Sequence, residues 1–406
     1  MITKLSNGLT VCTQSMPGVE TAALTLLADC GSQHEPAALN GMAHLYEHMV
    51  FKGAGTRSAR EISEAIEDVG GELNACTERD ATSFTASVMA EHVPLALELL
   101  ADLIVRPHFN AEDLDREKQV VLQELAEAED TPSDIIFDEL WSAAFADQPL
   151  GRSILGSEAS VNAISADDLR QWRDRHYSGD RLILSVAGKV DHDEVTAAAE
   201  RLFSPLPSAV DPTGELASFT GGTRVGRTPS EQAHLTFAFE GPAIGTPQAL
   251  PARLFADIVG GGASSRLFQE VREQRGLAYS VSASLQSYRE TGIFYVHAAT
   301  ARRDGPAAAQ LISDVIAAAA SDITERELSR ARNQARAGLL MNLETSWGRA
   351  GYAARQLATY GRVKSVDEVL AELDAVTLDQ LGEAAADLLS GPMARATIGM
   401  PAARAA

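Results

Sequence analysis

Residues 39–55 read LNGMAHLYEHMVFKGAG, and the five letters HLYEH at 44–48 carry the most chemical information in the chain. Positions i and i+4 of an α-helix share a face, so a helix here would point His44 and His48 the same way. Glu47 lies three residues after His44, which puts its carboxylate on or near that face. Two imidazoles and a carboxylate on one face are typical of a catalytic zinc site, here in the inverted His-x-x-Glu-His order.

The flanking residues predict the helix itself. Asn40 is the expected N-cap, and Met42, Leu45, Met49 and Val50 supply an apolar side. A single histidine on a helix is more often a surface or satisfied core residue than a metal ligand. The pair with a glutamate between them favours a metal site, but a zinc ion needs at least one further ligand from the protein.

Length and composition indicate an ordinary globular protein. A chain of 406 residues, 45% hydrophobic and 22% charged, is long enough for two domains of about 200 residues. No apolar run approaches the roughly 18 residues of a membrane span. The polar start, MITKLSNGLTVCTQS, has the pattern of neither a signal nor a transit peptide, which predicts a cytoplasmic location and no membrane partner. The three cysteines have no metal or disulfide spacing, in keeping with a reducing compartment.

The charge of the chain restricts its partners. A formal net charge of −22 would repel phosphates and argues against nucleic acid as a ligand. The same charge is compatible with a cationic ligand such as a basic peptide.

The chain reads as an internal duplication. Segments 163–188 and 375–400 align at a constant offset, and each predicts a capped helix, a Ser-Gly turn and a β-strand. Segments 110–130 and 324–345 both predict long helices that follow a Thr or Asn cap.

These repeats predict two homologous domains, 1–204 and 231–406, joined by a Pro-, Gly-, Ser- and Thr-rich linker at 205–230. Strands, such as those expected at 181–188 and 292–299, occur in groups and do not alternate strictly with helices. That order favours an α+β fold with largely antiparallel pairing over a doubly wound sheet.

The helix expected at 110–130 offers a third ligand. One face of it has helical spacing and is formed by Leu114, Glu117, Val121, Glu124, Leu125 and Ala128. A glutamate in an apolar stripe is costly unless it is paired or binds a cation. In the duplicate helix Ala331 and Gly338 stand opposite Glu117 and Glu124, and the second half also has no counterpart of His44 and His48. This joint absence indicates that the four residues work together.

The assignment of the two glutamates is open at this point. Glu124 is the better candidate for the third ligand, since two His and one Glu leave a fourth position for water. Glu117 would orient a ligand histidine through a hydrogen bond. Alternatively, either glutamate forms ion pairs with Arg116, Lys118 or a neighbouring helix.

At this stage the chain resembles the pitrilysin/insulinase family of inverted-motif zinc metallopeptidases, specifically its processing-peptidase-like branch of short two-domain subunits. Four stretches carry the resemblance across the whole chain: HLYEHMVFKGAGTRS (44–58), GGELNACTERDATSF (70–84), EKQVVLQE (117–124) and SSRLFQEVREQRGLAYSV (264–281). The resemblance implies a clamshell assembly of four α+β domains, two from each of two short subunits, around a peptide-sized chamber.

The resemblance also implies roles for single residues. His44, His48 and Glu124 would bind one Zn²⁺ per chain, and Glu47 would be the general base of peptide hydrolysis. Asn74 and Ala75 would lie on an edge strand to which a peptide substrate adds as a further strand. Taken alone, that stretch reads as an ordinary hairpin.

Arg272 and Tyr279 match the Arg/Tyr pair with which family members hold the substrate near the metal. Arg272 would donate to a substrate carbonyl and Tyr279 to the developing oxyanion. Taken alone, an Arg and a Tyr seven residues apart would be read as structural.

The leading hypothesis is therefore a zinc metalloendopeptidase that hydrolyses peptides or unfolded segments in a closed chamber. The chain has both the zinc motif and the Arg/Tyr pair, which favours a homodimer over a heterodimer with a related subunit. The alternative is a non-catalytic or partner-dependent subunit of a heterodimeric peptidase or structural complex. The other seven histidines (His34, His92, His108, His176, His192, His234 and His297) have no metal-type spacing and are interpreted as structural.

Overall fold

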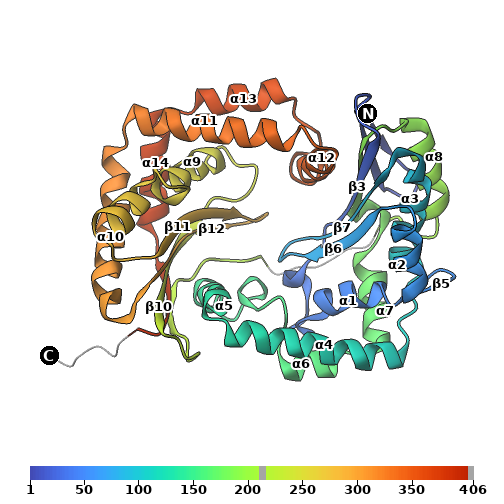
Figure 1. Ribbon diagram of the computed structural model, residues 1–406, viewed down its shortest axis with the longest axis horizontal. Helices are drawn as coiled ribbons and strands as arrows, with labels where there is room; N and C mark the ends of the chain where they lie inside the picture. Colours follow the sequence, from blue (N-terminus) through green and yellow to red (C-terminus); the bar gives the residue numbers. More distant parts are fainter. Residues whose placement is uncertain (210–215, 401–406) are drawn as a thin grey trace. The chain divides into compact units, whose positions relative to one another are not determined.

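The computed structural model describes residues 1–209 and 216–400, and the chain forms two compact units, each a β-sheet covered by helices (Figure 1). The first unit comprises residues 1–125, 153–209 and 339–363, and the second comprises 126–152, 216–338 and 364–400. Mixed, mainly antiparallel sheets with helices on their faces confirm the predicted α+β class.

The first unit contains a six-stranded sheet. Its order is β1 (Ile2–Lys4), β2 (Thr10–Ser15), β8 (Leu182–Gly188), β3 (Thr21–Ala28), β7 (Thr82–Met89) and β6 (Glu72–Thr77). Only β2 and β8 pair in parallel among these neighbours. The hairpin and the strand expected near 70–89 and 181–188 are both present, and β6 lies at an edge of the sheet.

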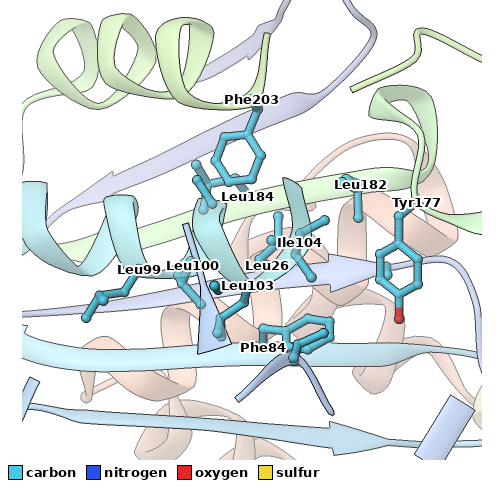
Figure 2. Packing of buried hydrophobic residues seen from close by; sticks show 14 of the residues in the cluster. Leu26, Phe84, Leu99, Leu100, Leu103, Ile104, Tyr177, Leu182, Leu184 and Phe203 are labelled. Carbon is cyan, nitrogen blue, oxygen red and sulfur yellow. The ribbon is translucent and has the colours of Figure 1, made fainter. Parts of the chain in front are cut away.

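This unit also contains α1 (Met42–Val50), α2 (Ala59–Glu67), α3 (Val93–Val105), α4 (Ala111–Asp130), α6 (Glu158–Ala163), α7 (Ala166–His176) and α8 (His192–Phe203), and β4 (Gly53–Ala54) and β5 (Arg57–Ser58) form a small hairpin. Among these helices, α1, α2, α3 and α8 contact the strands of the sheet. Figure 2 shows α3 packing on the strands, with Leu103 and Ile104 among Leu26, Phe84 and Leu184. Each fully buried side chain of this size contributes about 1.5 to 3 kcal/mol.

The second unit contains a five-stranded sheet. Its order is β11 (Ser280–Ser287), β12 (Gly292–Ala301), β10 (Gln232–Gly241), β13 (Met393–Ile398) and β9 (Gly222–Val225). The pairing is antiparallel except between β13 and β9. Its helices are α5 (Pro132–Ala144), α9 (Ala249–Gly260), α10 (Gly305–Asp322), α11 (Glu325–Asn342), α13 (Val366–Ala375) and α14 (Leu378–Ser390), with a π-helical segment at Phe268–Gln274.

The duplication is visible in matching helix starts. Ser165 and Asp168 form a capping box at the start of α7, and Thr377 and Gln380 form the equivalent box at the start of α14. Each helix is followed by a strand, β8 or β13, as the repeat predicts. The long helices α4 and α11 likewise correspond to the segments expected at 110–130 and 324–345.

The two halves of the chain exchange one helix each. α5 follows α4 in the first half but packs on β10, β13 and β9 of the second sheet. α12 (Ser346–Tyr360) follows α11 in the second half but packs on β2, β3 and β8 of the first sheet, through small and apolar residues such as Ala350, Ala353 and Leu357.

The compact units therefore do not follow the predicted boundaries 1–204 and 231–406. Two of the boundaries between the units fall within α4 and α11. Only part of the predicted linker 205–230 is described, and residues 222–225 of it form strand β9. Apolar periodicity predicts that a helix buries one face, but it does not specify which sheet receives that face.

Across residues 1–209 and 216–400, none of the helices combines the length and hydrophobicity that crossing a lipid bilayer requires.

Candidate metal centre

The centre begins with α1, a nine-residue helix that buries most of its surface. Six residues are buried: Met42, Ala43, Leu45, Tyr46, Met49 and Val50. The other three are His44, Glu47 and His48, each of intermediate exposure. A helix this short is marginal in isolation, so packing of the apolar face stabilises it. The same packing leaves all three polar side chains on the remaining face.

The start of α1 differs from the prediction. The N-cap is Gly41, with a left-handed φ of 94°, and Asn40 lies one residue earlier. The helix N-terminus is instead held by Glu35, which is only 3% exposed. Its two carboxylate oxygens accept hydrogen bonds from Gly41 N at 2.8 Å and from Ala43 N at 2.7 Å. Asn40 donates its side-chain amide to the same carboxylate, at 2.6 Å, and so acts through Glu35.

The α4 helix brings Glu124 to the two histidines. Its Oε2 atom lies 3.7 Å from Nε2 of His44 and 3.5 Å from Nε2 of His48. Potential ligand atoms of the three residues lie within 4.8 Å of one another, the one group of three or more such residues found in the described part of the chain. The pKa of His44 is lowered to about 4, mainly by burial and to a smaller extent by the nearby His48. Its imidazole is therefore neutral at pH 7, as metal ligation requires.

These three residues fit a zinc ion on geometric grounds. Ligand atoms bound tetrahedrally at about 2.0 to 2.1 Å stand about 3.3 Å apart, close to the two distances from Glu124. Glu124 Oε2 is buried and has no hydrogen-bond partner, since both imidazole nitrogens are too distant to donate to it. A buried carboxylate oxygen without a donor is costly, and a cation between the three atoms would satisfy it.

Glu117, one of the buried residues of α4, contacts the opposite nitrogen of His48. Its Oε2 lies 3.1 Å from His48 Nδ1, and its Oε1 pairs with Lys52 at 2.7 Å. A carboxylate at this nitrogen fixes the ring orientation and the tautomer that leaves Nε2 free to bind a metal. The ion-pair partner of Glu117 is therefore Lys52, which follows α1 in the chain, whereas the sequence offered Arg116, Lys118 or a residue of a neighbouring helix.

Glu47 points toward the hairpin beside α1. Its Oε2 accepts a hydrogen bond from the hydroxyl of Thr77 at 2.5 Å. Burial raises the pKa of Glu47 above its usual 4.5, while hydrogen bonds from the Thr77 side chain and backbone act in the opposite direction. A carboxylate with a raised pKa is a better proton acceptor near neutral pH than an exposed one.

Asn74 and Ala75 lie on β6, an edge strand of the sheet, which is the position that the family resemblance implies for them. The side-chain oxygen of Asn74 accepts the backbone N–H of Ala75 at 2.8 Å. An incoming strand that pairs with this N–H must displace the Asn74 side chain. The outer edge of β6 has no neighbouring strand in the sheet, but the Ala75 N–H on this strand already donates to the Asn74 side chain.

Arg272 and Tyr279 belong to the second unit, so the geometry around His44 and His48 does not test their role. The guanidinium of Arg272 lies 4.6 Å from the ring centre of Phe268 and 5.5 Å from that of Tyr279. Phe268 and Arg272 share the π-helical segment, and Tyr279 is 77% exposed. Single-turn π-helices often occur at functional sites.

Several contacts of this centre were not predicted from the sequence. Thr77 contacts Glu47 and Lys52 contacts Glu117, while Glu35 holds the start of α1. The spacing along the chain singled out none of these three residues. Among the other histidines, His234 and His297 lie on neighbouring strands with ring nitrogens 3.4 Å apart. Their separation by 62 intervening residues gave no sign of this contact.

Known proteins are similar to this chain over nearly its whole length. Residues 10–158 match the family model described as insulinase (peptidase family M16), and residues 163–335 match the model described as the peptidase M16 inactive domain. An uncharacterized zinc protease of Rickettsia felis is 36% identical over 399 residues, covering 98% of this chain and 97% of that protein. The uncharacterized zinc protease YmxG of Bacillus subtilis is 34% identical, covering 97% and 96%.

Solved structures share the fold over the whole chain. A peptidase M16 inactive-domain structure from Pseudomonas fluorescens has a TM-score of 0.91 at 21% identity and covers 100% of this chain and 98% of its own. A protease from Helicobacter pylori has a TM-score of 0.91 at 19% identity and covers 99% of each chain.

Two homologous α+β domains with an inverted His-x-x-Glu-His helix define a class of peptidase-like proteins. Within that class, the matched models and relatives show that this chain belongs to peptidase family M16, the pitrilysin/insulinase family, as a short member. The predicted family is confirmed.

Proposed function

We propose that the chain is a zinc-dependent endopeptidase that hydrolyses peptides or unfolded segments. The observation that carries this proposal is the convergence of His44, His48 and Glu124, whose Glu124 oxygen lies 3.7 and 3.5 Å from the two imidazoles. The names of the relatives, uncharacterized zinc proteases, support zinc as the ion.

The proposed mechanism assigns a task to each residue. His44, His48 and Glu124 would hold one Zn²⁺, and Glu117 would keep the His48 ring in place. The chemistry that zinc supplies at such a site is polarisation of the scissile carbonyl and a lowered pKa for a water molecule. Glu47 accepts a proton from the attacking water at its carboxylate and returns it to the leaving amine.

Substrate binding would use the free edge of β6. An extended peptide that pairs with the backbone near Ala75 gains affinity from main-chain hydrogen bonds, which are tolerant of sequence. The Asn74 side chain would release its hydrogen bond with the Ala75 N–H when the peptide pairs there. Arg272 and Tyr279 would donate hydrogen bonds to the substrate carbonyl and to the oxyanion that develops there.

The assembly is part of the proposal. We expect a homodimer that encloses a peptide-sized chamber and excludes folded proteins, since one chain carries both the His-His-Glu group and the Arg/Tyr pair. A heterodimer with a related subunit is the alternative arrangement. The acidic chain, with its net charge of −22, favours basic peptides as substrates. The predicted cytoplasmic location stays a prediction.

The deciding experiment compares the wild type with Glu47→Gln. Zinc content is measured by elemental analysis, and cleavage is measured with a library of quenched fluorescent peptides. The expected result is about one zinc per chain in both proteins, with cleavage reduced by about 10² to 10⁴ in the variant, the usual contribution of a general acid–base group. Size-exclusion chromatography with light scattering reports the mass of the active species.

Two outcomes would contradict the proposal. If the two proteins cleave equally, Glu47 is not the base. If the wild type binds zinc but cleaves no peptide alone, the chain is a non-catalytic or partner-dependent subunit, and proteins that co-purify with it would be the next subject.

A further inference from the structure

The hydroxyl of Thr77 links the edge strand β6 to Glu47. Thr77 is the last residue of β6 and is 9% exposed. Its Oγ1 donates to Glu47 Oε2 at 2.5 Å and lies 3.4 Å from the carbonyl oxygen of Ala43 in α1. A hydroxyl has a single proton, and the shorter distance assigns it to the carboxylate.

The backbone of Thr77 faces the free edge of the sheet. Glu78 N donates to Ala81 O at 2.8 Å, which makes Glu78–Ala81 a hydrogen-bonded pair of the β6–β7 hairpin. Directly opposed pairs alternate in an antiparallel ladder, so the bonded pairs continue at Cys76–Ser83 and Asn74–Thr85. The N–H and C=O groups of Leu73, Ala75 and Thr77 therefore point away from β7.

The outward N–H of Thr77 is already used. Both the side chain and the backbone of Thr77 hydrogen-bond the Glu47 carboxylate. An added strand can therefore pair with the edge near Leu73 and Ala75, but at Thr77 the donor belongs to Glu47. The pairing edge ends at the carboxylate that we assign as the general base.

We propose that Thr77 is a positioning residue that fixes the Glu47 carboxylate and ends the edge with which a peptide pairs. The peptide bond just beyond the paired segment would then lie beside Glu47, the proposed general base. This inference rests on the proposed peptidase function. Two hydrogen bonds from one residue hold the carboxylate in one orientation. Without the hydroxyl, the carboxylate keeps one of them and gains rotational freedom, while the edge near Ala75 is unchanged.

The kinetic test compares Thr77→Val, which replaces the hydroxyl by a methyl group, with Thr77→Ser, which restores it. Thr82→Val is the matched control, because Thr82 is buried, lies directly opposite Thr77 and donates to Cys30 O at 2.8 Å, away from Glu47. We expect Thr77→Val to lower kcat about 10- to 100-fold with KM nearly unchanged, the loss of one hydrogen bond to a charged group. Thr77→Ser should recover most of kcat, Thr82→Val should retain it, and zinc content should be equal in all variants.

A second measurement does not depend on activity. Thermal unfolding of Thr77→Val, Glu47→Ala and the double variant forms a double-mutant cycle, and the same cycle is made with Thr82→Val. The Tm losses should be non-additive for Thr77 with Glu47 and additive for Thr82 with Glu47.

The results separate this inference from the proposed function. Additive Tm losses for Thr77 and Glu47 would overturn the inference, as would a Thr77→Val variant with wild-type kcat or a Thr77→Ser variant as impaired as Thr77→Val. A rise in KM with kcat unchanged would also overturn it. A wild type that cleaves no peptide would instead overturn the proposed function, and the unfolding cycle would still decide whether Thr77 holds Glu47.

Discussion

The Nδ1 atom of His48 lies 3.1 Å from Oε2 of Glu117, on the opposite edge of the ring from the nitrogen that faces Glu124. The imidazole is thus contacted by a carboxylate at each nitrogen. Glu117 in turn is held by Lys52 at 2.7 Å, which follows α1 in the chain. Protein groups therefore fix the orientation of the ring.

Glu117→Gln tests this arrangement. The substitution keeps the size of the side chain but removes its charge, so the bond to His48 and the ion pair with Lys52 both weaken. We expect zinc affinity to fall by about 10- to 100-fold, as is usual for partners of metal-binding histidines. Competition with a chelator measures this affinity. Lys52→Met is the control that removes the ion pair alone, and it should weaken zinc binding less.

Glu124→Ala tests the third ligand. Without this carboxylate only two protein ligands remain, and stoichiometric zinc should be lost from the purified protein. The matched control is Glu127→Ala, because Glu127 is an exposed glutamate of the same helix three residues later. Elemental analysis of both variants gives the result. Full zinc content in Glu124→Ala would show that this glutamate is not a ligand.

The histidine pair of the second sheet predicts a pH dependence of stability. Burial and the neighbouring His234 lower the pKa of His297 to about 4, and burial also lowers the pKa of His234. The unfolded chain, with histidine pKa values near 6.5, then binds more protons than the folded chain between pH 6.5 and about 4. The free energy of unfolding should therefore fall as the pH falls through this window.

His297→Phe removes one of these titrating groups. The side chain lies 5.2 Å, ring centre to ring centre, from Phe137, so an aromatic replacement has a suitable environment. Calorimetry gives the Tm at pH 7 and at pH 5, and the decrease in Tm between these two pH values should be smaller for the variant than for the wild type. His92→Phe, at a more exposed histidine, should not reduce the loss. If the Tm of His297→Phe decreases between pH 7 and pH 5 as much as that of the wild type, His297 does not cause the pH dependence.

Leu357→Ala tests the helix exchange. Leu357 of α12 is 6% exposed and packs with Cys12 and Ile183 of the first sheet. Truncation of a buried leucine costs about 2 to 4 kcal/mol, so denaturant unfolding should show a clear loss of stability. Leu340→Ala, at a leucine that is 40% exposed, should change stability by less than about 0.5 kcal/mol. Equal effects of the two substitutions would contradict the packing of α12 on this sheet.

The α+β class, the duplication and the candidate ligands follow from local patterns in the sequence. The aligned repeats and their caps predicted the helices at 110–130 and 324–345 and the strand at 181–188. Periodicity predicted the buried face of the first helix, because a helix that buries one face repeats its apolar residues with its own period. The spacing of His44 and His48 put both on one helical face for the same reason. The stripe of α4, together with its loss in the duplicate, selected Glu117 and Glu124.

Contacts between separate segments of the chain, near or far in sequence, were decided by the tertiary structure alone. Asn40 has the residue type of an N-cap, but Glu35 holds the helix start, since the fold of the preceding loop buries its carboxylate against two backbone N–H groups. The exchange of α5 and α12 is likewise invisible in periodicity, which encodes that a helix has an apolar face but not its partner.

What the sequence by itself determined was the set of chemical groups and the local faces that carry them. What only the tertiary structure decided was which groups meet: Glu117 with His48 and Lys52, and Thr77 with Glu47. These contacts depend on how separate elements pack, and packing is set by the shape of many buried side chains together, which no spacing along one segment records.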